Sequence, residues 1–123
     1  IHNQRYPNAQ KKLIMVIKGK IFDVAVDLRK DSKTYKEYFG KVLSDENKYQ
    51  LFLPEGFGHA FLTLSDEAHI LYAVDKPYMP KEEFNIRYDD PSLNINWDNI
   101  REKYIPDVPY KLSRKDLNAY YLE

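Results

Sequence analysis

Two mostly apolar runs lie on either side of Gly19 between residues 12 and 28, and this pattern constrains the fold more than any other feature of the chain. A mostly apolar run ends at Lys18, Gly19 interrupts it, and a second run covers residues 21–28. Side chains of a β-strand point alternately to its two faces, so one face of the second run seeks a core. The residues on that face are Phe22, Val24 and Val26. The pattern predicts a β-hairpin with its turn at Gly19.

Further strands are expected along the first two thirds of the chain, each ending at a polar or proline-containing turn. They are residues 35–43, 49–53, 60–64 and 69–74, and the last two are expected to pair across residues 65–67. The sequence has 18 aromatic residues (11 Tyr, 6 Phe, 1 Trp) but only 4 Gly, which suits half-buried pleated surfaces. The fold class predicted is all-β, a sandwich or barrel.

Beyond Asp75 the chain should wrap around the sheets, because prolines interrupt any continuous ladder of backbone hydrogen bonds. These prolines are Pro77, Pro80, Pro91, Pro106 and Pro109. Ser113 followed by Asp116 resembles a capping box and predicts a short C-terminal helix that covers residues 117–122. No repeat or linker divides the chain, so residues 1–123 are expected to form a single domain.

Composition excludes several functions. The chain has no cysteine, so it has no thiol chemistry or thiolate metal site. Its 19 Lys and Arg residues balance 19 Asp and Glu residues, which argues against nucleic acid or an anionic membrane as partner. Its longest purely apolar run, Leu13–Ile17, is far too short to cross a membrane, and the start does not resemble a signal peptide. We expect a soluble, cytoplasmic protein.

One short motif is chemically suggestive. Residues 54–59 match the Pro-x-Gly-x-x-His core of the second cupin motif, in which a turn delivers an imidazole to the mouth of a β-barrel. Taken alone, the motif is weak, and a Pro/Gly turn with an exposed His59 is the favoured interpretation. A metal site needs about three or four convergent ligands, and the three histidines of this chain lie far apart in sequence. We therefore expect no metal and no cofactor.

Six longer blocks of sequence carry a further signal: residues 9–13, 21–29, 43–47, 50–61, 89–91 and 112–116. Together they resemble the dTDP-4-dehydrorhamnose 3,5-epimerase family. The resemblance implies a cupin-type jelly roll, a homodimer without a metal, and inversion at the carbons that flank the 4-keto group of a nucleotide-linked 6-deoxy sugar. It runs from Ile1 to about Trp97 and reappears near the C-terminus.

The resemblance also assigns roles. His2 matches the proton-abstracting base, and Asp116 matches the carboxylate that binds it. Tyr72 matches the tyrosine on the opposite face of the sugar ring, and Lys12 matches the lysine near the keto oxygen. The positions that match substrate contacts are His59, Glu83, Lys115, Gln4 and the nucleotide-stacking Tyr78. His69 matches no family role and is expected to be structural.

These residue types suit the reaction. A C–H bond beside a ketone can be broken when a cation such as Lys12 stabilises the charge that forms on the oxygen. A neutral imidazole at His2 is a suitable base near pH 7, and the carboxylate of Asp116 would fix its tautomer. A phenol such as Tyr72 can return a proton to the opposite face. Each residue also has a plainer reading as a surface histidine, a solvated lysine, a packed tyrosine or a helix-capping acid.

Departures from the family leave alternatives open. The family's N-terminal segment is missing, so the numbering starts inside a longer polypeptide, or the chain is a fragment or a divergent form. Asn3 replaces an aromatic residue, and Pro77 separates Lys76 from Tyr78 where the family has two adjacent tyrosines. The favoured function is 3,5-epimerisation. The alternatives are a C3-only epimerase, an epimerase of another nucleotide-linked keto sugar such as a GDP-linked heptose, and a non-catalytic cupin that binds sugar nucleotides.

Overall fold

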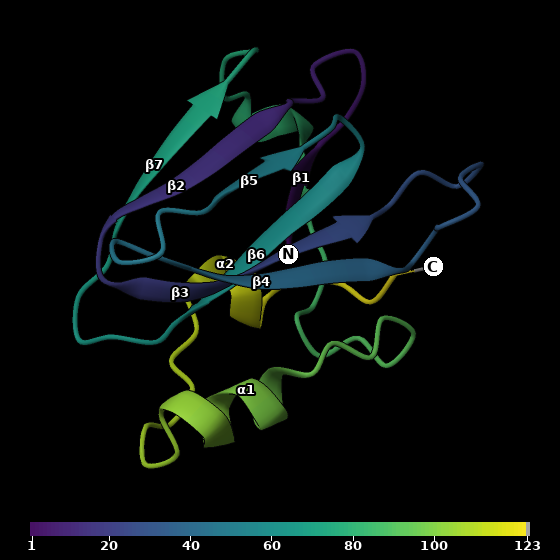
Figure 1. The fold of residues 1–123 in the computed structure, drawn as a ribbon. Coiled ribbons are helices and arrows are strands. Elements are labelled where there is room, and N and C mark those ends of the chain that lie inside the picture. The colour runs from purple at the N-terminus through teal and green to yellow at the C-terminus, as the bar shows by residue number, and fades with distance from the viewer. Residues whose placement is uncertain (123) are drawn as a thin grey trace.

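Two antiparallel β-sheets pack against each other, and the C-terminal third of the chain covers the outer face of the larger sheet (Figure 1). This computed structural model describes residues 1–122. The five-stranded sheet has the order β4 (Tyr38–Ser44), β3 (Lys20–Asp27), β6 (Phe57–Thr63), β1 (His2–Gln4) and β8 (Glu83–Asn85). The three-stranded sheet has the order β5 (Gln50–Leu53), β2 (Lys12–Lys18) and β7 (His69–Val74).

The expected strands are present within a few residues of their predicted bounds, but two predicted pairings are wrong. β2 and β3 lie in different sheets instead of forming a hairpin, because the chain turns a corner at Gly19, whose φ is +92°. Likewise, β6 and β7 lie in different sheets and do not pair. Each connection carries the chain from one sheet to the other, which alternation within a single strand cannot reveal.

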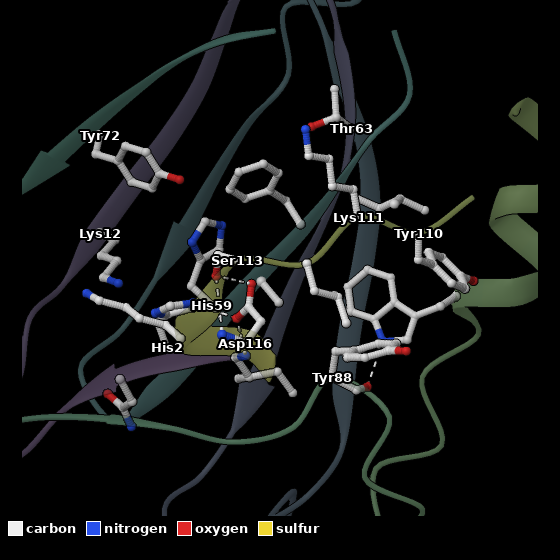
Figure 2. A pocket seen from close by; sticks show the side chains of 18 of the residues that line it. His2, Lys12, His59, Thr63, Tyr72, Tyr88, Tyr110, Lys111, Ser113 and Asp116 are labelled. Atoms are coloured by element: carbon white, nitrogen blue, oxygen red, sulfur yellow. Dashed lines mark hydrogen bonds and ion pairs between the residues drawn. The ribbon is translucent and has the colours of Figure 1, made fainter. Parts of the chain in front are cut away.

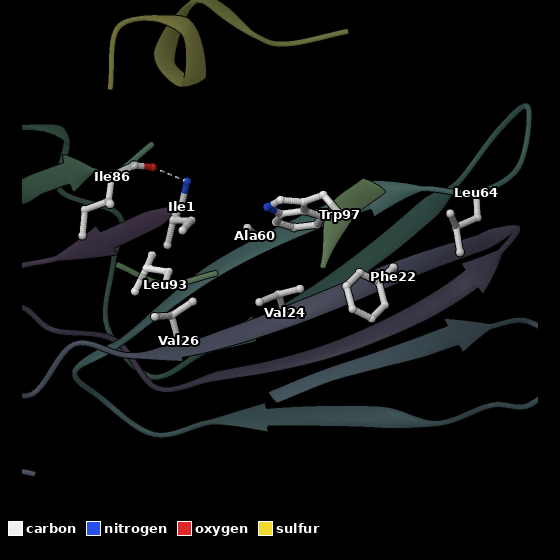
Figure 3. Packing of buried hydrophobic residues seen from close by; sticks show 9 residues of the cluster. All are labelled: Ile1, Phe22, Val24, Val26, Ala60, Leu64, Ile86, Leu93 and Trp97. Carbon is white, nitrogen blue, oxygen red and sulfur yellow. Dashed lines mark hydrogen bonds between the residues drawn. The ribbon is translucent and has the colours of Figure 1, made fainter. Parts of the chain in front are cut away.

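Two apolar clusters hold the layers together. One lies between the sheets, and its members are Ile14, Val16, Ile21, Ala25, Leu43 and Leu53. The other lies between the five-stranded sheet and the C-terminal segment, with Phe22 and Trp97 in edge-to-face contact at 5.9 Å (Figure 3). Strand β3 contributes to both clusters, so its whole length from Ile21 to Asp27 is buried rather than one face alone. The clusters therefore place β3 and β6 in the middle layer of the molecule.

The C-terminal segment contains more regular structure than the prolines suggested. A 3₁₀ turn, η1 (Pro80–Glu82), leads into β8, and helix α1 (Trp97–Tyr104) occupies the proline-free window between Pro91 and Pro106. Helix α2 (Arg114–Leu117) begins after Ser113, as the capping signal indicates, but it ends where the predicted helix should start. Among residues 1–122, no helix combines the length and apolar character needed to cross a lipid bilayer.

Candidate active site

The chemistry-bearing side chains come from strands that face each other across the space between the two sheets. In the larger sheet, His2 on β1 is the direct register partner of His59 on β6. In the smaller sheet, Tyr72 on β7 is the register partner of Ile14, a member of the cluster between the sheets. Lys12 lies two residues before Ile14, so period-two alternation places it on the same inward face. The four side chains surround one region (Figure 2).

His2 is bound on both sides of its ring. Its Nε2 lies 2.9 Å from Oδ1 of Asp116, and its Nδ1 lies 2.9 Å from Oε1 of Glu83. Asp116 is itself held by helix α2, because Ser113 Oγ accepts a hydrogen bond from its backbone N–H and donates one to its Oδ2 at 3.0 Å. The predicted pairing of His2 with Asp116 is present, and the pairing with Glu83 was not foreseen.

Glu83 connects the histidine to the rim of the site. Its carboxylate accepts hydrogen bonds from Tyr78 Oη and from Lys115 Nζ, the latter at 3.0 Å. Lys115 also donates to Tyr78 Oη at 2.9 Å. Burial alone would raise the pKa of Glu83, but the hydrogen bonds from Tyr78, His2 and Lys115 outweigh it and lower the pKa to about 2. Glu83 is therefore an anion at neutral pH.

A second histidine–carboxylate pair lies beside the first. Asp23 on β3 is fully buried, and its Oδ1 lies 2.5 Å from His59 Nε2. Burial raises the pKa of Asp23, while its hydrogen bond with His59 opposes that change. Its Oδ2 has no hydrogen-bond partner among residues 1–122. Sequence analysis missed this pair, although a carboxylate flanked by the apolar residues Phe22 and Val24 was the available signal.

Lys12 and Tyr72 form the wall that faces the two histidines. Burial lowers the pKa of Lys12, and the charges of Glu83 and Asp23 partly offset this effect. Burial raises the pKa of Tyr72 to about 12, and the nearby charge of Asp23 adds to the shift. The Tyr72 ring stands edge-on to the His59 ring with centroids 5.6 Å apart. The phenol is thus protonated at neutral pH and lies next to a histidine.

All nine residues proposed from the resemblance line a single cavity of about 860 Å³. They are His2, Gln4, Lys12, His59, Tyr72, Tyr78, Glu83, Lys115 and Asp116. Phe61, Thr63, Trp97 and Tyr110 extend the cavity toward the C-terminal segment. Within residues 1–122, no group of three or more His, Asp or Glu side chains has the arrangement of a metal site.

Gln4 and His69 have structural contacts rather than free side chains that face the cavity. The side chain of Gln4 is occupied by backbone groups, because its Nε2 donates to Asn8 O and Pro77 O and its Oε1 accepts from Met79 N. Gln4 thereby fixes the loop that carries Tyr78. His69 lies at the exposed start of β7, where its Nε2 lies 2.6 Å from Oε1 of Glu67, outside the cavity.

Comparisons with known proteins agree with this architecture. The sequence profile of the dTDP-4-dehydrorhamnose 3,5-epimerase family matches residues 1–123. The chain is 52% identical over 97 residues to the dTDP-4-dehydrorhamnose 3,5-epimerase of Methanothermobacter thermautotrophicus, an alignment that covers 79% of this chain and 52% of that relative.

Solved structures give the same result. A dTDP-6-deoxy-D-glucose-3,5-epimerase from Legionella pneumophila, in complex with dTDP-4-keto-L-rhamnose, has a TM-score of 0.86 and 39% identity, with 98% of this chain and 60% of that chain covered. A 3′-monoepimerase from Streptomyces bikiniensis, in complex with dTDP-quinovose, has a TM-score of 0.86 and 31% identity, with 98% and 58% covered. The chain spans about half to three fifths of the length of these relatives.

The two-layered sheet with polar residues gathered between its layers is a cupin-type jelly roll, as the sequence analysis expected. The chain belongs to the dTDP-4-dehydrorhamnose 3,5-epimerase family.

Proposed function

We propose that this protein is an isomerase that inverts the carbons flanking the keto group of a nucleotide-linked 4-keto-6-deoxy sugar. The observation that carries the proposal is the arrangement of a carboxylate-bound histidine, a half-buried lysine and a protonated tyrosine around one cavity. Membership of the family supports the same reaction class.

In the first step, His2 removes a proton from the carbon beside the keto group. The C–H bond breaks, its electron pair forms the enolate, and the proton becomes an N–H on the imidazole. Asp116, at 2.9 Å from the other nitrogen, orients the ring and stabilises its positive charge. Lys12 is placed to face the enolate oxygen, where a preorganised cation lowers the barrier.

In the second step, Tyr72 returns a proton to the opposite face of the same carbon. A phenol with a pKa raised to about 12 keeps its proton at neutral pH, yet it can give that proton to a strongly basic enolate. Solvent then reprotonates the phenolate, and His2 releases its proton. The reaction needs no oxidant or reductant, because one proton is removed and one is added.

The rim of the cavity suits the nucleotide part of the substrate. Tyr78 offers an exposed ring on which a base can stack, and Lys115 offers an ammonium group for phosphate. The similar structures from Legionella and Streptomyces are complexes with dTDP-linked sugars. We propose a thymidine diphosphate-linked sugar as the substrate.

Inversion at one carbon alone is a second candidate, because the structurally similar Streptomyces protein is a monoepimerase. Incubation with a dTDP-4-keto-6-deoxyglucose in deuterated water, followed by NMR, decides between the candidates. Deuterium at C3 and C5 supports the double epimerase, and deuterium at C3 alone selects the monoepimerase. Bound ligand without exchange at either carbon would leave a non-catalytic binding protein.

Variants assign the two proton-transfer residues in the same experiment. His2→Asn should abolish exchange at both carbons. Tyr72→Phe should retain proton abstraction but slow the return of the proton, with a loss of product formation of roughly 10²–10⁴-fold. If Tyr72→Phe forms the inverted product at the parental rate, Tyr72 is not the acid.

We also propose that the protein is a homodimer, joined through the outer face of the three-stranded sheet. Ile17, Phe52 and Leu71 are 60%, 55% and 47% exposed on that face. Phe52 and Leu71 are the register partners of Leu13 and Met15, so these apolar side chains are contiguous. A contiguous apolar surface of this kind is a common site of subunit association.

A further inference from the structure

The two ring nitrogens of His2 are both bound to carboxylates, which is unusual for a base that must accept a proton. Nδ1 lies 2.9 Å from Glu83 and Nε2 lies 2.9 Å from Asp116. An ionised carboxylate only accepts hydrogen bonds, whereas a neutral imidazole has one N–H and one lone pair. Two such contacts therefore fit a ring that carries a hydrogen on each nitrogen. A ring in that form has no lone pair with which to remove a proton from carbon.

The two carboxylates are held in different ways. Asp116 belongs to helix α2 and is fixed by Ser113 within the first turn of that helix. Glu83 is held by residues at the rim of the cavity, since its other hydrogen bonds come from Tyr78 and Lys115. Asp116 can therefore stay on the histidine throughout the reaction, while the position of Glu83 depends on the rim.

The residues that hold Glu83 are the ones placed to meet the nucleotide. The Tyr78 residue is 55% exposed, and the Lys115 side chain is 54% exposed. A phosphate oxygen would compete with Glu83 for the Lys115 ammonium, and its negative charge would repel the carboxylate. A base stacked on Tyr78 would compete for space at the same rim. Occupation of the rim thus removes two of the three groups that bind Glu83.

We propose that Glu83 is a gate on the catalytic base: it occupies Nδ1 of His2 in the free protein and leaves when the nucleotide part of a ligand binds Tyr78 and Lys115. This inference rests on the proposed function, because it assigns the rim to a nucleoside diphosphate. With this gate, His2 can remove a proton only from substrates that carry the nucleotide.

The proton on Nδ1 has a defined destination. Burial raises the pKa of Glu83 and the bonds from Tyr78, His2 and Lys115 lower it, so loss of the Tyr78 and Lys115 bonds makes Glu83 a better proton acceptor. As Glu83 departs, the Nδ1–H bond breaks and an O–H bond forms on the carboxyl group. His2 becomes neutral with a free lone pair on Nδ1, while Asp116 still accepts the hydrogen on Nε2. In this way, energy from binding the remote nucleotide is used to prepare the reacting centre.

Nitrogen-15 NMR of the histidine side chains at pH 7 tests the gate directly, with dTDP as the probe. The signals of His2 are assigned by their absence in His2→Asn. In the free wild-type protein we expect both ring nitrogens of His2 to carry hydrogen, and saturation with dTDP should remove the hydrogen from Nδ1. In Glu83→Gln, Nδ1 should lack its hydrogen before dTDP is added. Glu82→Gln is the matched control, because Glu82 makes no side-chain hydrogen bond or ion pair among residues 1–122, and it should behave as wild type.

A kinetic measurement separates gating from simple substrate contact. The rate of solvent deuterium exchange is measured for the full nucleotide sugar and for the same keto sugar without its nucleotide. The rate with the sugar that lacks its nucleotide should be at least tenfold higher in Glu83→Gln than in wild type or Glu82→Gln. Loss of an ordinary contact would lower activity on the full substrate without helping the truncated one.

The outcomes distinguish this inference from the proposed function. Wild-type epimerisation, together with an Nδ1 that is unchanged by bound dTDP, overturns the gate and leaves the function intact. An unchanged rate with the truncated sugar in Glu83→Gln also overturns the gate. Failure of the wild-type protein both to bind dTDP and to exchange any carbon-bound proton overturns the proposed function, and the gate falls with it.

Discussion

At the scale of single residues, the charge of Lys12 lowers the stability of the fold in return for reactivity. Burial lowers its pKa, which means that the folded protein binds the lysine proton less tightly than the unfolded chain does. The charged form is therefore disfavoured by folding at pH 7, apart from the attraction of Glu83 and Asp23. Such a residue is retained for chemistry rather than for stability.

We predict that Lys12→Met keeps or raises the urea midpoint of unfolding at pH 7 while epimerisation falls by roughly 10²–10³-fold, the loss typical of removing a group that stabilises an oxyanion. Lys11→Met is the control, because Lys11 is the neighbouring exposed residue. It should leave both quantities near wild type. A Lys12→Met protein that is strongly destabilised would show that the lysine is mainly structural.

At the scale of secondary-structure elements, the short pieces at the ends of the chain build the site. Ser113 caps helix α2, which has four residues and carries both Asp116 and Lys115. Ser113→Ala should cost about 1 kcal/mol, the usual value for loss of a helix cap, and should lower kcat because Asp116 is no longer fixed. Ser113→Thr restores the hydroxyl group and should recover most of both. If kcat is unchanged in Ser113→Ala, the cap does not position the dyad.

The link between β8 and α2 should be sensitive to acid. The pKa of Glu83 is lowered to about 2 in the folded protein, so the folded state prefers the ionised form. This contribution is fully present above the ordinary glutamate pKa of about 4.3 and is lost as the pH falls toward 2. Urea unfolding between pH 5 and pH 2 should therefore show a shallower loss of stability in Glu83→Gln than in Glu82→Gln. Parallel curves for the two variants would contradict the assignment.

The sequence predicted the strands better than their partners. The pattern of short apolar runs bounded by turn residues located β2, β3 and β7, because such runs are readable from neighbouring residues. It paired β2 with β3 wrongly, because nothing in either strand records that Gly19 turns the chain into a second sheet. Strands β1 and β8 have three residues each, which is too few for a periodic signal.

The site followed a similar pattern. Residues carried over from the family, such as His2 and Tyr72, line the cavity. Asp23 was overlooked, since alternation assigned it to a polar face whereas β3 is buried on both faces. The contact between Glu83 and His2 was also missed, because it joins residues 81 positions apart. Contacts of this kind depend on how the last third of the chain folds back over the first strand.

At the scale of the whole molecule, the exposed apolar face of the three-stranded sheet should govern assembly. We predict that Leu71→Lys converts a dimer into a monomer, because it places a charge at the centre of the contiguous patch that includes Phe52 and Ile17. Light scattering after size exclusion measures the mass. Tyr120→Lys is the control, because Tyr120 is 80% exposed on the C-terminal segment, away from this sheet. A dimer that survives Leu71→Lys would place the interface elsewhere.

The pairing of His2 with His59 across β1 and β6 couples correct folding to activity. A slip of β1 by one residue would turn every side chain of that strand to the opposite face. His2 would then leave the cavity at the same moment that Ile1 left the apolar cluster beneath it. A chain with this shifted register would therefore be unstable as well as inactive. Cellular proteolysis that removes poorly folded chains would also remove the inactive ones.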